Sequence, residues 1–375
     1  MAQRTRVLLL LAHLGGGGAE HVMALLAGGL SQEKYEVHLG LIRDADAAGV
    51  TVPSWVTVHA LGAGRARAGA LPLLRLVWRL RPGVVLSGAT EVSFLVLLLR
   101  PVFPWKTCVL VRQNATVSSV LAFGGVPRYT RMLYRLLYRR SDRVICQSRA
   151  MAEDLAREAG IGRGQIVVLP NPVDLEGIRA ARSAPSLWRG AGPHLLAVGR
   201  LSGEKGFDLL VNALVAVRQR FPEADLILAG AGREERSLRE LCRSLGLETA
   251  VHFAGHVDRP YDLYPGATLF VLSSRHEGMP NALLEAATAG ALPLVATPAS
   301  GGVVDLLRNR PGAWLAPEIS AEALATAILA ALDAIRPGQR FCQPFFPSPP
   351  QRPRTAACDC ETQARERQTT ASGQK

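Results

Sequence analysis

The stretch SRHEGMPNALLEA, residues 274–286, decides how the second half of the chain is expected to fold. An apolar, β-prone segment at 267–273 precedes it and has the composition of a buried strand. Good helix formers continue to Ala289, and Gly290 is a suitable C-terminal stop. Pro280 suits the first helical position, where a missing N–H is tolerated. The stretch therefore predicts a strand, a tight turn and a helix that begins at the carboxyl end of the strand.

The predicted turn carries groups that suit a phosphorylated ligand. The free N–H groups and the positive dipole end of the helix would face a phosphate above the sheet. Gly278 lets the backbone approach a ligand closely. Glu277 lies in the turn and Glu285 on the helix, with seven residues between them. We expect Glu285 to take both hydroxyls of a ribose and Glu277 to face a sugar.

The pattern of the whole chain predicts an α/β fold with two domains. Apolar strand segments alternate with helical segments through both halves, which is typical of parallel sheets. A length of 375 residues allows each domain its own core. We expect a first domain at 1–171, a second at 172–335, and ligands at the carboxyl ends of the strands, between the domains.

Composition narrows the classes of function. The formal charge of +12 favours phosphorylated substrates, anionic lipid or nucleic acid as partners, but no nucleic-acid-binding module is visible. No apolar run approaches the ~18 residues of a spanning helix, and the N-terminus resembles a first strand more than a signal peptide. The six cysteines form no Cys-x-x-Cys pair, so we expect reduced thiols in a cytoplasmic protein. We interpret Asp44–Asp46 as a solvated turn and expect no metal site.

Two further loops suit an anionic ligand. Glycines at 15–18 follow the apolar strand 7–12 and precede a helix, an arrangement that favours phosphate binding. In the second half, GRLSGEKG at 199–206 follows another strand and offers Arg200 and Lys205 as cations.

Together these segments resemble a known family. HEGMPNALLEA (276–286), GGAEH (17–21), PNPVD (170–174) and GRLSGEKG (199–206) are similar to motifs of the retaining, nucleotide-sugar-dependent glycosyltransferases of family 4, the glycosyl transferases group 1. The resemblance covers residues 5–335. It implies the GT-B fold, in which two Rossmann-like domains with parallel sheets face each other across an interdomain cleft. The first would bind the acceptor and the second the nucleotide sugar.

The resemblance also implies a mechanism. A hexosyl or N-acetylhexosaminyl group would pass, with retention, from a nucleotide sugar to an acceptor hydroxyl, and we favour a UDP-sugar as donor. Arg200 and Lys205 would stabilise the departing diphosphate without a metal or other cofactor. Glu277 would orient the donor sugar and stabilise positive charge near its anomeric carbon. The predicted donor-binding residues are Glu285, Gly16, Gly17, Gly278, Met279, Pro280, Asn281 and His256. Arg112 and Asn114 are the acceptor-side candidates.

The segment PRYTRMLYRLLYRR, residues 127–140, combines arginines with tyrosines and leucines. At helical spacing, Met132, Leu133, Leu136 and Leu137 would form an apolar stripe flanked by Tyr and Arg. Such a helix suits an anionic membrane surface, although a core-packed helix with a solvated basic face would have the same composition. The first interpretation predicts a peripheral enzyme at the inner face of the cytoplasmic membrane, with a lipid-linked acceptor in cell-envelope polysaccharide or glycolipid synthesis.

The last forty residues, 336–375, depart from the family. They contain six prolines and little apolar periodicity, which predicts a disordered or atypical tail. Two alternatives to transfer stay open at this point. One is a nucleotide-sugar epimerase on the same fold, and the other is a non-catalytic protein that binds nucleotide sugar or membrane.

Overall fold

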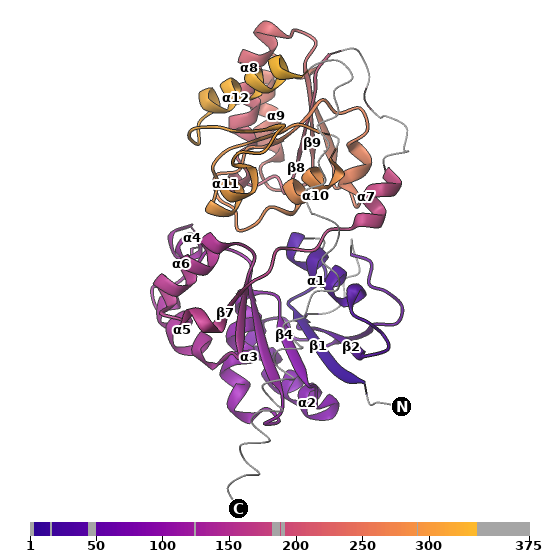
Figure 1. Cartoon of the computed structure of the whole chain (residues 1–375), viewed down its shortest axis with the longest axis vertical. Coiled ribbons are helices and arrows are strands. Elements are labelled where there is room, and N and C mark those ends of the chain that lie inside the picture. Colours follow the sequence, from indigo (N-terminus) through magenta and orange to yellow (C-terminus); the bar gives the residue numbers. More distant parts are fainter. Residues whose placement is uncertain are drawn as a thin grey trace, which may run out of the picture. The chain divides into compact units, whose positions relative to one another are not determined.

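The computed structural model describes residues 4–15, 17–43, 50–123, 125–181, 188, 192–290 and 292–335, which form the coloured ribbon in Figure 1. They divide between two compact units, unit 1 up to Pro172 and unit 2 from Val173. Each unit has a parallel sheet with helices, as the α/β prediction requires. The predicted turn Asp44–Asp46 and the predicted tail 336–375 lie outside the described residues.

Unit 1 contains a seven-stranded sheet in the order β3-β2-β1-β4-β5-β6-β7, with every neighbouring pair parallel. The described strands are β1 (Thr5–Leu11), β2 (Tyr35–Leu41), β3 (Thr57–Ala60), β4 (Val84–Ser87), β5 (Cys108–Gln113), β6 (Arg143–Cys146) and β7 (Ile166–Val168). The described α-helices are α1 (Gly18–Gly29), α2 (Ala70–Leu80), α3 (Thr90–Leu99), α4 (Val117–Phe123), α5 (Thr130–Leu137) and α6 (Arg149–Ala159). Short 3-10 helices are η1 (Ala66–Gly69), η2 (Arg100–Val102), η3 (Tyr138–Arg140) and η4 (Arg163–Gln165).

Alternate residues of the central strands fill two cores in unit 1. Leu8 and Leu10 of β1 pack with side chains of α2, α3, α5 and α6 on one face of the sheet. Val7 and Leu9 pack on the other face with Met23 of α1. Because both faces are covered, the strands are apolar runs without polar alternation.

Unit 2 contains a six-stranded parallel sheet in the order β10-β9-β8-β11-β12-β13. The described strands are β8 (His194–Val198), β9 (Asp225–Ala229), β10 (Val251–Gly255), β11 (Leu269–Leu272), β12 (Leu294–Ala296) and β13 (Ala313–Leu315). The described helices are α7 (Leu175–Ala181), η5 (Gly203–Lys205), α8 (Phe207–Arg220), α9 (Glu235–Ser244), η6 (Pro260–Leu263), α10 (Asn281–Ala289), α11 (Gly301–Leu307) and α12 (Ala321–Ala334).

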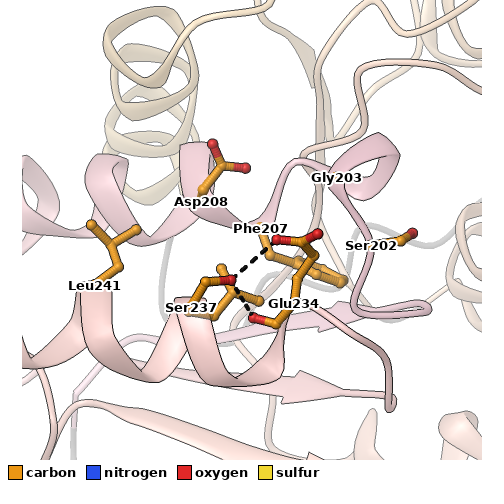
Figure 2. A pocket seen from close by; sticks show the side chains of 8 residues that line it. Ser202, Gly203, Phe207, Asp208, Glu234, Ser237 and Leu241 are labelled. Atoms are coloured by element: carbon orange, nitrogen blue, oxygen red, sulfur yellow. Dashed lines mark hydrogen bonds between the residues drawn. The ribbon is translucent and has the colours of Figure 1, made fainter. Parts of the chain in front are cut away.

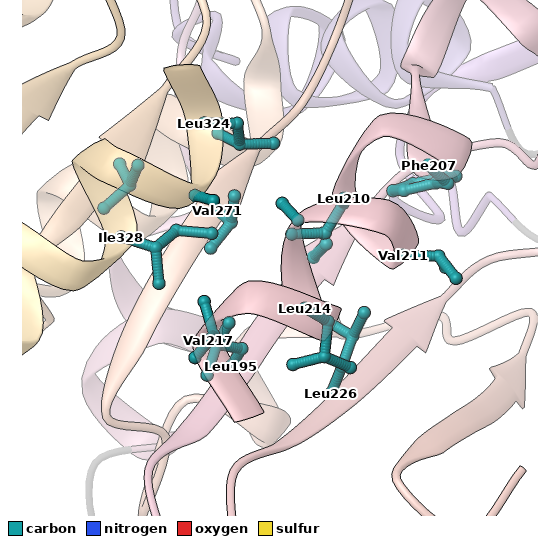
Figure 3. Close-up of a cluster of buried hydrophobic side chains, with 14 of the residues drawn as sticks. Leu195, Phe207, Leu210, Val211, Leu214, Val217, Leu226, Val271, Leu324 and Ile328 are labelled. Atoms are coloured by element: carbon teal, nitrogen blue, oxygen red, sulfur yellow. The ribbon is translucent and has the colours of Figure 1, made fainter. Parts of the chain in front are cut away.

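The sheet of unit 2 is also covered on both faces. Figure 3 shows the larger core, where Leu210 and Leu214 of α8 meet Val271 of β11 and Ile328 of α12. The other face is covered by α10 and by the tyrosines of the η6 segment. Helix α8 begins after Gly206 and presents apolar residues at helical spacing to the sheet.

The strand orders identify where each unit can bind a ligand. In unit 1 the chain moves outward from β1 to β3 and then returns to start β4 beside β1. In unit 2 it moves from β8 to β10 and returns to start β11 beside β8. Ligands of such sheets bind at the carboxyl ends of the strands at this switch point. The loops after β8 and β11 are therefore the expected site in unit 2.

Helix α5 differs from the prediction for 127–140. The helix is shorter, and Tyr134 and Tyr138 are fully buried, whereas Met132 and Leu136 are exposed. The predicted apolar stripe is divided between core and surface, because the tyrosine rings pack edge-on against Phe94 and their hydroxyl groups lie near the side chain of Gln113. The tyrosine side chains can be buried in the core because their hydroxyl groups have a hydrogen-bond partner in Gln113. Apolar Met and Leu side chains are left beside arginines on the surface.

Candidate functional site

The predicted strand, turn and helix at 267–290 are present in unit 2. Strand β11 ends at Leu272, and α10 begins at Asn281 after the extended Pro280. The helix ends at Gly290, which has a left-handed φ of 66°. The N-terminal end of α10 thus follows the carboxyl end of β11 at the switch point.

A partly buried ion pair joins the two loops at this switch point. Lys205 Nζ lies 2.7 Å from Glu277 Oε1, and the two side chains are 22% and 8% exposed. Ser274 Oγ donates to the same carboxylate oxygen at 2.6 Å. The structure therefore brings together two of the three predicted catalytic residues, one from each loop.

Close backbone packing holds Lys205 in place. Gly206 has φ of 61°, and a Cβ atom there would lie 2.1 Å from the carbonyl oxygen of Ser273. Ser273 Oγ in turn donates to the carbonyl oxygen of Lys205 at 2.9 Å. Only glycine fits this backbone conformation and this approach without strain.

A second ion pair, not predicted from the sequence, braces the same turn. Arg275 donates from both terminal nitrogens to Asp208, at 2.7 and 2.6 Å. This pairing lowers the pKa of Asp208 and raises that of Arg275. Arg275 Nη1 also donates to the carbonyl oxygen of Gly203 at 2.9 Å. The pair ties the β11 turn to the start of α8.

Hydroxyl groups from the loop after β12 support the turn from another side. Thr297 Oγ1 donates to the carbonyl oxygen of Ser274 at 2.5 Å. Ser300 Oγ, which also caps α11, donates to the carbonyl oxygen of Gly278 at 3.3 Å. Met279 is half-buried in the same turn. Backbone and side-chain bonds thus fix the turn before any ligand arrives.

Glu285 lies on the second turn of α10 and is only 7% exposed. Burial, together with the negative charge of Asp174, raises its pKa to about 7. Asp174 precedes α7, accepts from the backbone N–H of Gly177 at 2.9 Å, and accepts from the Tyr261 hydroxyl at 2.7 Å. Asp174, the last residue of the PNPVD motif, and Tyr261 are neighbours of Glu285 to which the sequence analysis gave no role in the site. The sequence does not show that these two residues lie near Glu285, because only the fold brings the three segments together.

The remaining predicted donor-side groups have other contacts or lie in unit 1. Arg200 is exposed and pairs with Glu204 at 3.2 Å. His256 is exposed and pairs with Asp258 at 3.2 Å. Gly17 is the N-cap of α1 in unit 1, and Gly16 lies outside the described residues.

The acceptor-side candidates form a buried network in unit 1. Arg112, the fifth residue of β5, donates to Oδ1 of Asn114 and to Oδ1 of Asn171, the latter at 2.5 Å. Asn114 Nδ2 donates to the carbonyl oxygen of Gly88, just beyond β4. Arg112 is 5% exposed, and burial lowers its pKa to about 10. It is still a cation at neutral pH.

A separate cavity of about 260 Å³ lies in unit 2 between the first turns of α8 and α9 (Figure 2). Ser237 on its wall donates to the carbonyl oxygen and the carboxylate of Glu234. Gly203 and Asp208 line it as well, so it backs onto the contacts of Arg275. None of the predicted site residues lines this cavity.

The described part of the chain lacks a cluster of metal ligands and a helix that could span a membrane. No three His, Cys, Asp or Glu side chains within it are grouped as metal ligands would be. None of its helices has the length and apolar composition needed to cross a bilayer.

Family models match both units. Residues 16–176 match "Glycosyltransferase Family 4", and residues 192–334 match "Glycosyl transferases group 1". The chain belongs to the group 1 glycosyl transferases. The family inferred from the sequence motifs is thereby confirmed, and so is its two-sheet α/β fold.

Curated relatives of this glycosyltransferase have several activities. An N-acetylgalactosamine-N,N'-diacetylbacillosaminyl-diphospho-undecaprenol 4-alpha-N-acetylgalactosaminyltransferase from Campylobacter jejuni is 28% identical over 284 residues, 72% of this chain and 75% of the relative. A mannosylfructose-phosphate synthase from Agrobacterium fabrum is 35% identical over 171 residues, 41% of this chain and 37% of the relative. An uncharacterized glycosyltransferase from Haemophilus influenzae is 30% identical over 134 residues, 36% of this chain and 38% of the relative. The chain thus spans less than two fifths of the last two relatives.

Solved structures share the fold of this glycosyltransferase. HepE of Anabaena, crystallised in complex with UDP, superposes with a TM-score of 0.70 at 17% identity, over 99% of this chain and 100% of that one. TarM of S. aureus, crystallised with UDP and sugar ligands, superposes with a TM-score of 0.73 at 10% identity, over 96% of each chain. At these identities the likeness concerns the fold alone.

Proposed function

We propose that this protein transfers a hexosyl or N-acetylhexosaminyl group, with retention of configuration, from a UDP-sugar to an acceptor hydroxyl. The observation that carries the proposal is the pairing of Lys205 with Glu277 beside the start of α10. A fixed cation, a helix N-terminus and a carboxylate at the carboxyl edge of one sheet suit a nucleoside diphosphate linked to a sugar.

In the proposed reaction, Lys205 and the N–H groups at the start of α10 stabilise the diphosphate as negative charge develops on it. No metal ion is needed in this scheme, because the ammonium group and the helix dipole supply the positive charge. Arg200 joins them after its side chain leaves Glu204, an exchange that exposure of both side chains makes easy.

Glu277 binds hydroxyl groups of the donor sugar and stabilises positive charge near the anomeric carbon. The Lys205 and Ser274 contacts hold its carboxylate in one orientation. Glu285, in its ionised form, accepts hydrogen bonds from both ribose hydroxyls. The leaving phosphate oxygen takes the proton of the acceptor hydroxyl, so that no protein side chain is required as the base.

We further propose a lipid-linked acceptor and a peripheral location on the inner face of the cytoplasmic membrane. Residues 65–140 contain thirteen Lys and Arg but a single acidic residue, Glu91, a formal charge of +12. The formal charge of the whole chain is also +12, so the residues outside 65–140 have a net formal charge of zero. The excess charge is thus concentrated in one segment that includes α2, α3, α4 and α5, where anionic lipid would attract it.

The same segment exposes large apolar side chains. They are Leu71, Trp78, Leu98, Val102, Trp105, Phe123, Tyr129, Met132 and Leu136. Trp78 donates to the carbonyl oxygen of Val102 at 3.0 Å, and the ammonium group of Lys106 lies 5.0 Å from the centre of the Trp105 ring. Apolar groups interleaved with cations are typical of surfaces that lie on anionic bilayers.

Vesicle binding tests the membrane part of the proposal. The protein is expected to sediment with vesicles that contain phosphatidylglycerol and to stay in solution with pure phosphatidylcholine. Replacing Met132 and Leu136 by Ser should weaken sedimentation, whereas Ile319→Ser on exposed unit 2 surface should not. Equal sedimentation of all three proteins would contradict this part.

Transfer itself is tested by incubating the protein with UDP-sugars and undecaprenyl-phosphate-linked acceptors. Release of UDP with formation of a glycosylated lipid, and an anomeric configuration unchanged from the donor by NMR, would support retaining transfer. Conversion of the UDP-sugar to an epimer without acceptor, or binding without turnover, would contradict it.

A further inference from the structure

The carboxyl edge of β5, β6 and β7 in unit 1 gathers hydrogen-bond donors and one buried cation. Strands β5 and β6 are parallel neighbours, with Arg112 opposite Ile145. Gln147 follows β6 directly, two residues after Ile145. The backbone N–H of Leu169 donates to the carbonyl oxygen of Cys146, so the hydrogen bonds between β6 and β7 continue past the end of β7, toward Asn171.

Strand alternation places Arg112 and Gln147 on the same face of the sheet. Gln113 faces α5, because its side chain contacts the hydroxyl groups of Tyr134 and Tyr138. Cys146 belongs to the core on that same side. The residues next to these, Arg112 and Gln147, therefore face the opposite side.

Two buried groups on this face lack the partner that their chemistry requires. Among the described residues, Arg112 makes hydrogen bonds to two neutral amide oxygens but no ion pair with a carboxylate. Gln147 is 1% exposed, and its Nε2 atom finds no acceptor in the described structure. A buried cation and a buried N–H donor without acceptors are both costly, so each calls for an anionic or acceptor group.

The start of α6 adds further donors. Ser148 caps this eleven-residue helix by accepting from the N–H of Met151 at 3.2 Å. The N–H groups of Arg149 and Ala150 precede the first intrahelical bond, which Ala152 makes to Ser148. The helix therefore begins at Arg149, two residues after Gln147, with its positive dipole end at the same sheet edge.

We propose that unit 1 binds an oxyanion, a phosphate or carboxylate group of the acceptor, through Arg112 and Gln147. The guanidinium group supplies the charge, the Gln147 amide donates to a second oxygen, and the start of α6 adds its dipole. Asn114 and Asn171 orient the guanidinium group. This inference rests on the proposed transfer function, since it assigns the anion to the acceptor. It narrows the acceptor class to molecules with a negative group near the reacting hydroxyl.

Inorganic phosphate is the first probe, used with the full chain at constant ionic strength. Phosphate should raise the melting temperature of the wild type, and Arg112→Gln should weaken its apparent affinity at least tenfold. Arg163→Gln, at an exposed arginine of η4, is the matched control and should leave the affinity unchanged. A phosphate response that is the same in Arg112→Gln as in the wild type would overturn the proposal, because the anion would then bind elsewhere, for example at Lys205.

Gln147→Glu gives a readout that a purely structural role would not produce. The new carboxylate would act as a built-in counter-ion for Arg112, so the variant should melt at a higher temperature than the wild type without ligand. It should also lose the stabilisation by phosphate. A lower melting temperature with an unchanged phosphate response would overturn the proposal.

Two further experiments distinguish a carboxylate from a phosphate ester, and failure of the anion site from failure of nucleotide binding. Glucuronate and glucose 1-phosphate, compared with neutral glucose, distinguish a carboxylate from a phosphate ester; equal weak responses to all three would contradict an anion site. UDP binding is measured on every variant. Normal UDP binding with no effect of Arg112→Gln would remove this inference alone, whereas absence of UDP binding in the wild type would remove the proposed function.

Discussion

Replacing Glu285 by Gln is expected to stabilise the protein at alkaline pH and to weaken nucleotide binding. Glu285 is buried, and its pKa is raised from 4.5 to about 7 by burial and by the charge of Asp174. Ionising such a group in the folded protein opposes folding. Glutamine keeps the shape of the side chain and removes the charge.

The size of the effect follows from proton linkage. Below pH 4.5 the carboxyl group is protonated in both the folded and the unfolded protein, so it does not affect stability. Between pH 4.5 and about 7 only the unfolded protein loses the proton, and stability falls as pH rises. Above pH 7 the loss is complete and amounts to roughly 3 kcal/mol, because one pKa unit corresponds to about 1.4 kcal/mol. Glu285→Gln should recover most of this free energy at pH 8.5 and none at pH 4.5.

Thermal and chemical denaturation at several pH values measure the difference in stability between the variant and the wild type. At pH 8.5 the melting of unit 2 in the variant should lie roughly 5–10 °C above that in the wild type, from about 2–4 °C per kcal/mol for a domain of roughly 150–250 residues. UDP affinity should fall about 10-fold or more, because one charged acceptor of hydroxyl groups is lost. Glu248→Gln, at an exposed position of unit 2, should change neither quantity. A Glu285→Gln variant that is less stable than the wild type at pH 8.5 would refute the reasoning.

Three further predictions concern other parts of the molecule. Gly206→Ala should lower the free energy of unfolding by about 2 kcal/mol or more in urea titrations, since its φ is 61° and the new Cβ would meet a carbonyl oxygen of the β11 turn; an unchanged midpoint would refute this. Lys205→Met should reduce the transfer rate about 10²–10³-fold and should destabilise the fold, because Glu277 is left buried without its cation. The double variant Lys205→Met/Glu277→Gln should recover stability but not activity. A double variant that is as unstable as Lys205→Met would contradict the pairing. In unit 1, the side chains of His38 and His59 form a hydrogen bond of 3.1 Å, and burial lowers the pKa of both. Their contribution to stability is therefore present above pH 6.5 and is lost as the pH falls below that value. His38→Gln should reduce this loss of stability at acid pH, and an unchanged pH dependence would contradict the prediction.

Elements that are formed by neighbouring residues along the chain were predictable from the local sequence. The strand, turn and helix at 267–290 follow from composition, Pro280 and Gly290, and they bring Glu277 and Glu285 to the same helix end. Lys205, on the loop after β8, lies beside Glu277 because the parallel strands β8 and β11 end at one edge of the sheet. Its role in the reaction stays a prediction.

Contacts between distant segments were not predictable in this way. Arg275 and Asp208 are 67 positions apart, and nothing in either local sequence indicates the other. Asp174 and Tyr261 likewise meet only after the sheet of unit 2 has formed. Helix α5 shows a different limit. Periodicity predicted one apolar stripe of Met and Leu side chains, and it did not indicate that Tyr134 would be buried with Leu137 while Met132 and Leu136 stay exposed.

Calorimetric titration of UDP into the wild type and Lys205→Met, at pH 8 with EDTA present, tests most directly whether Lys205 binds the diphosphate. We expect metal-independent binding to the wild type and binding at least tenfold weaker in the variant. Absence of binding to a folded wild type, or binding that requires Mg²⁺ and is unaffected by Lys205→Met, would contradict the assignment of the diphosphate to this ion pair.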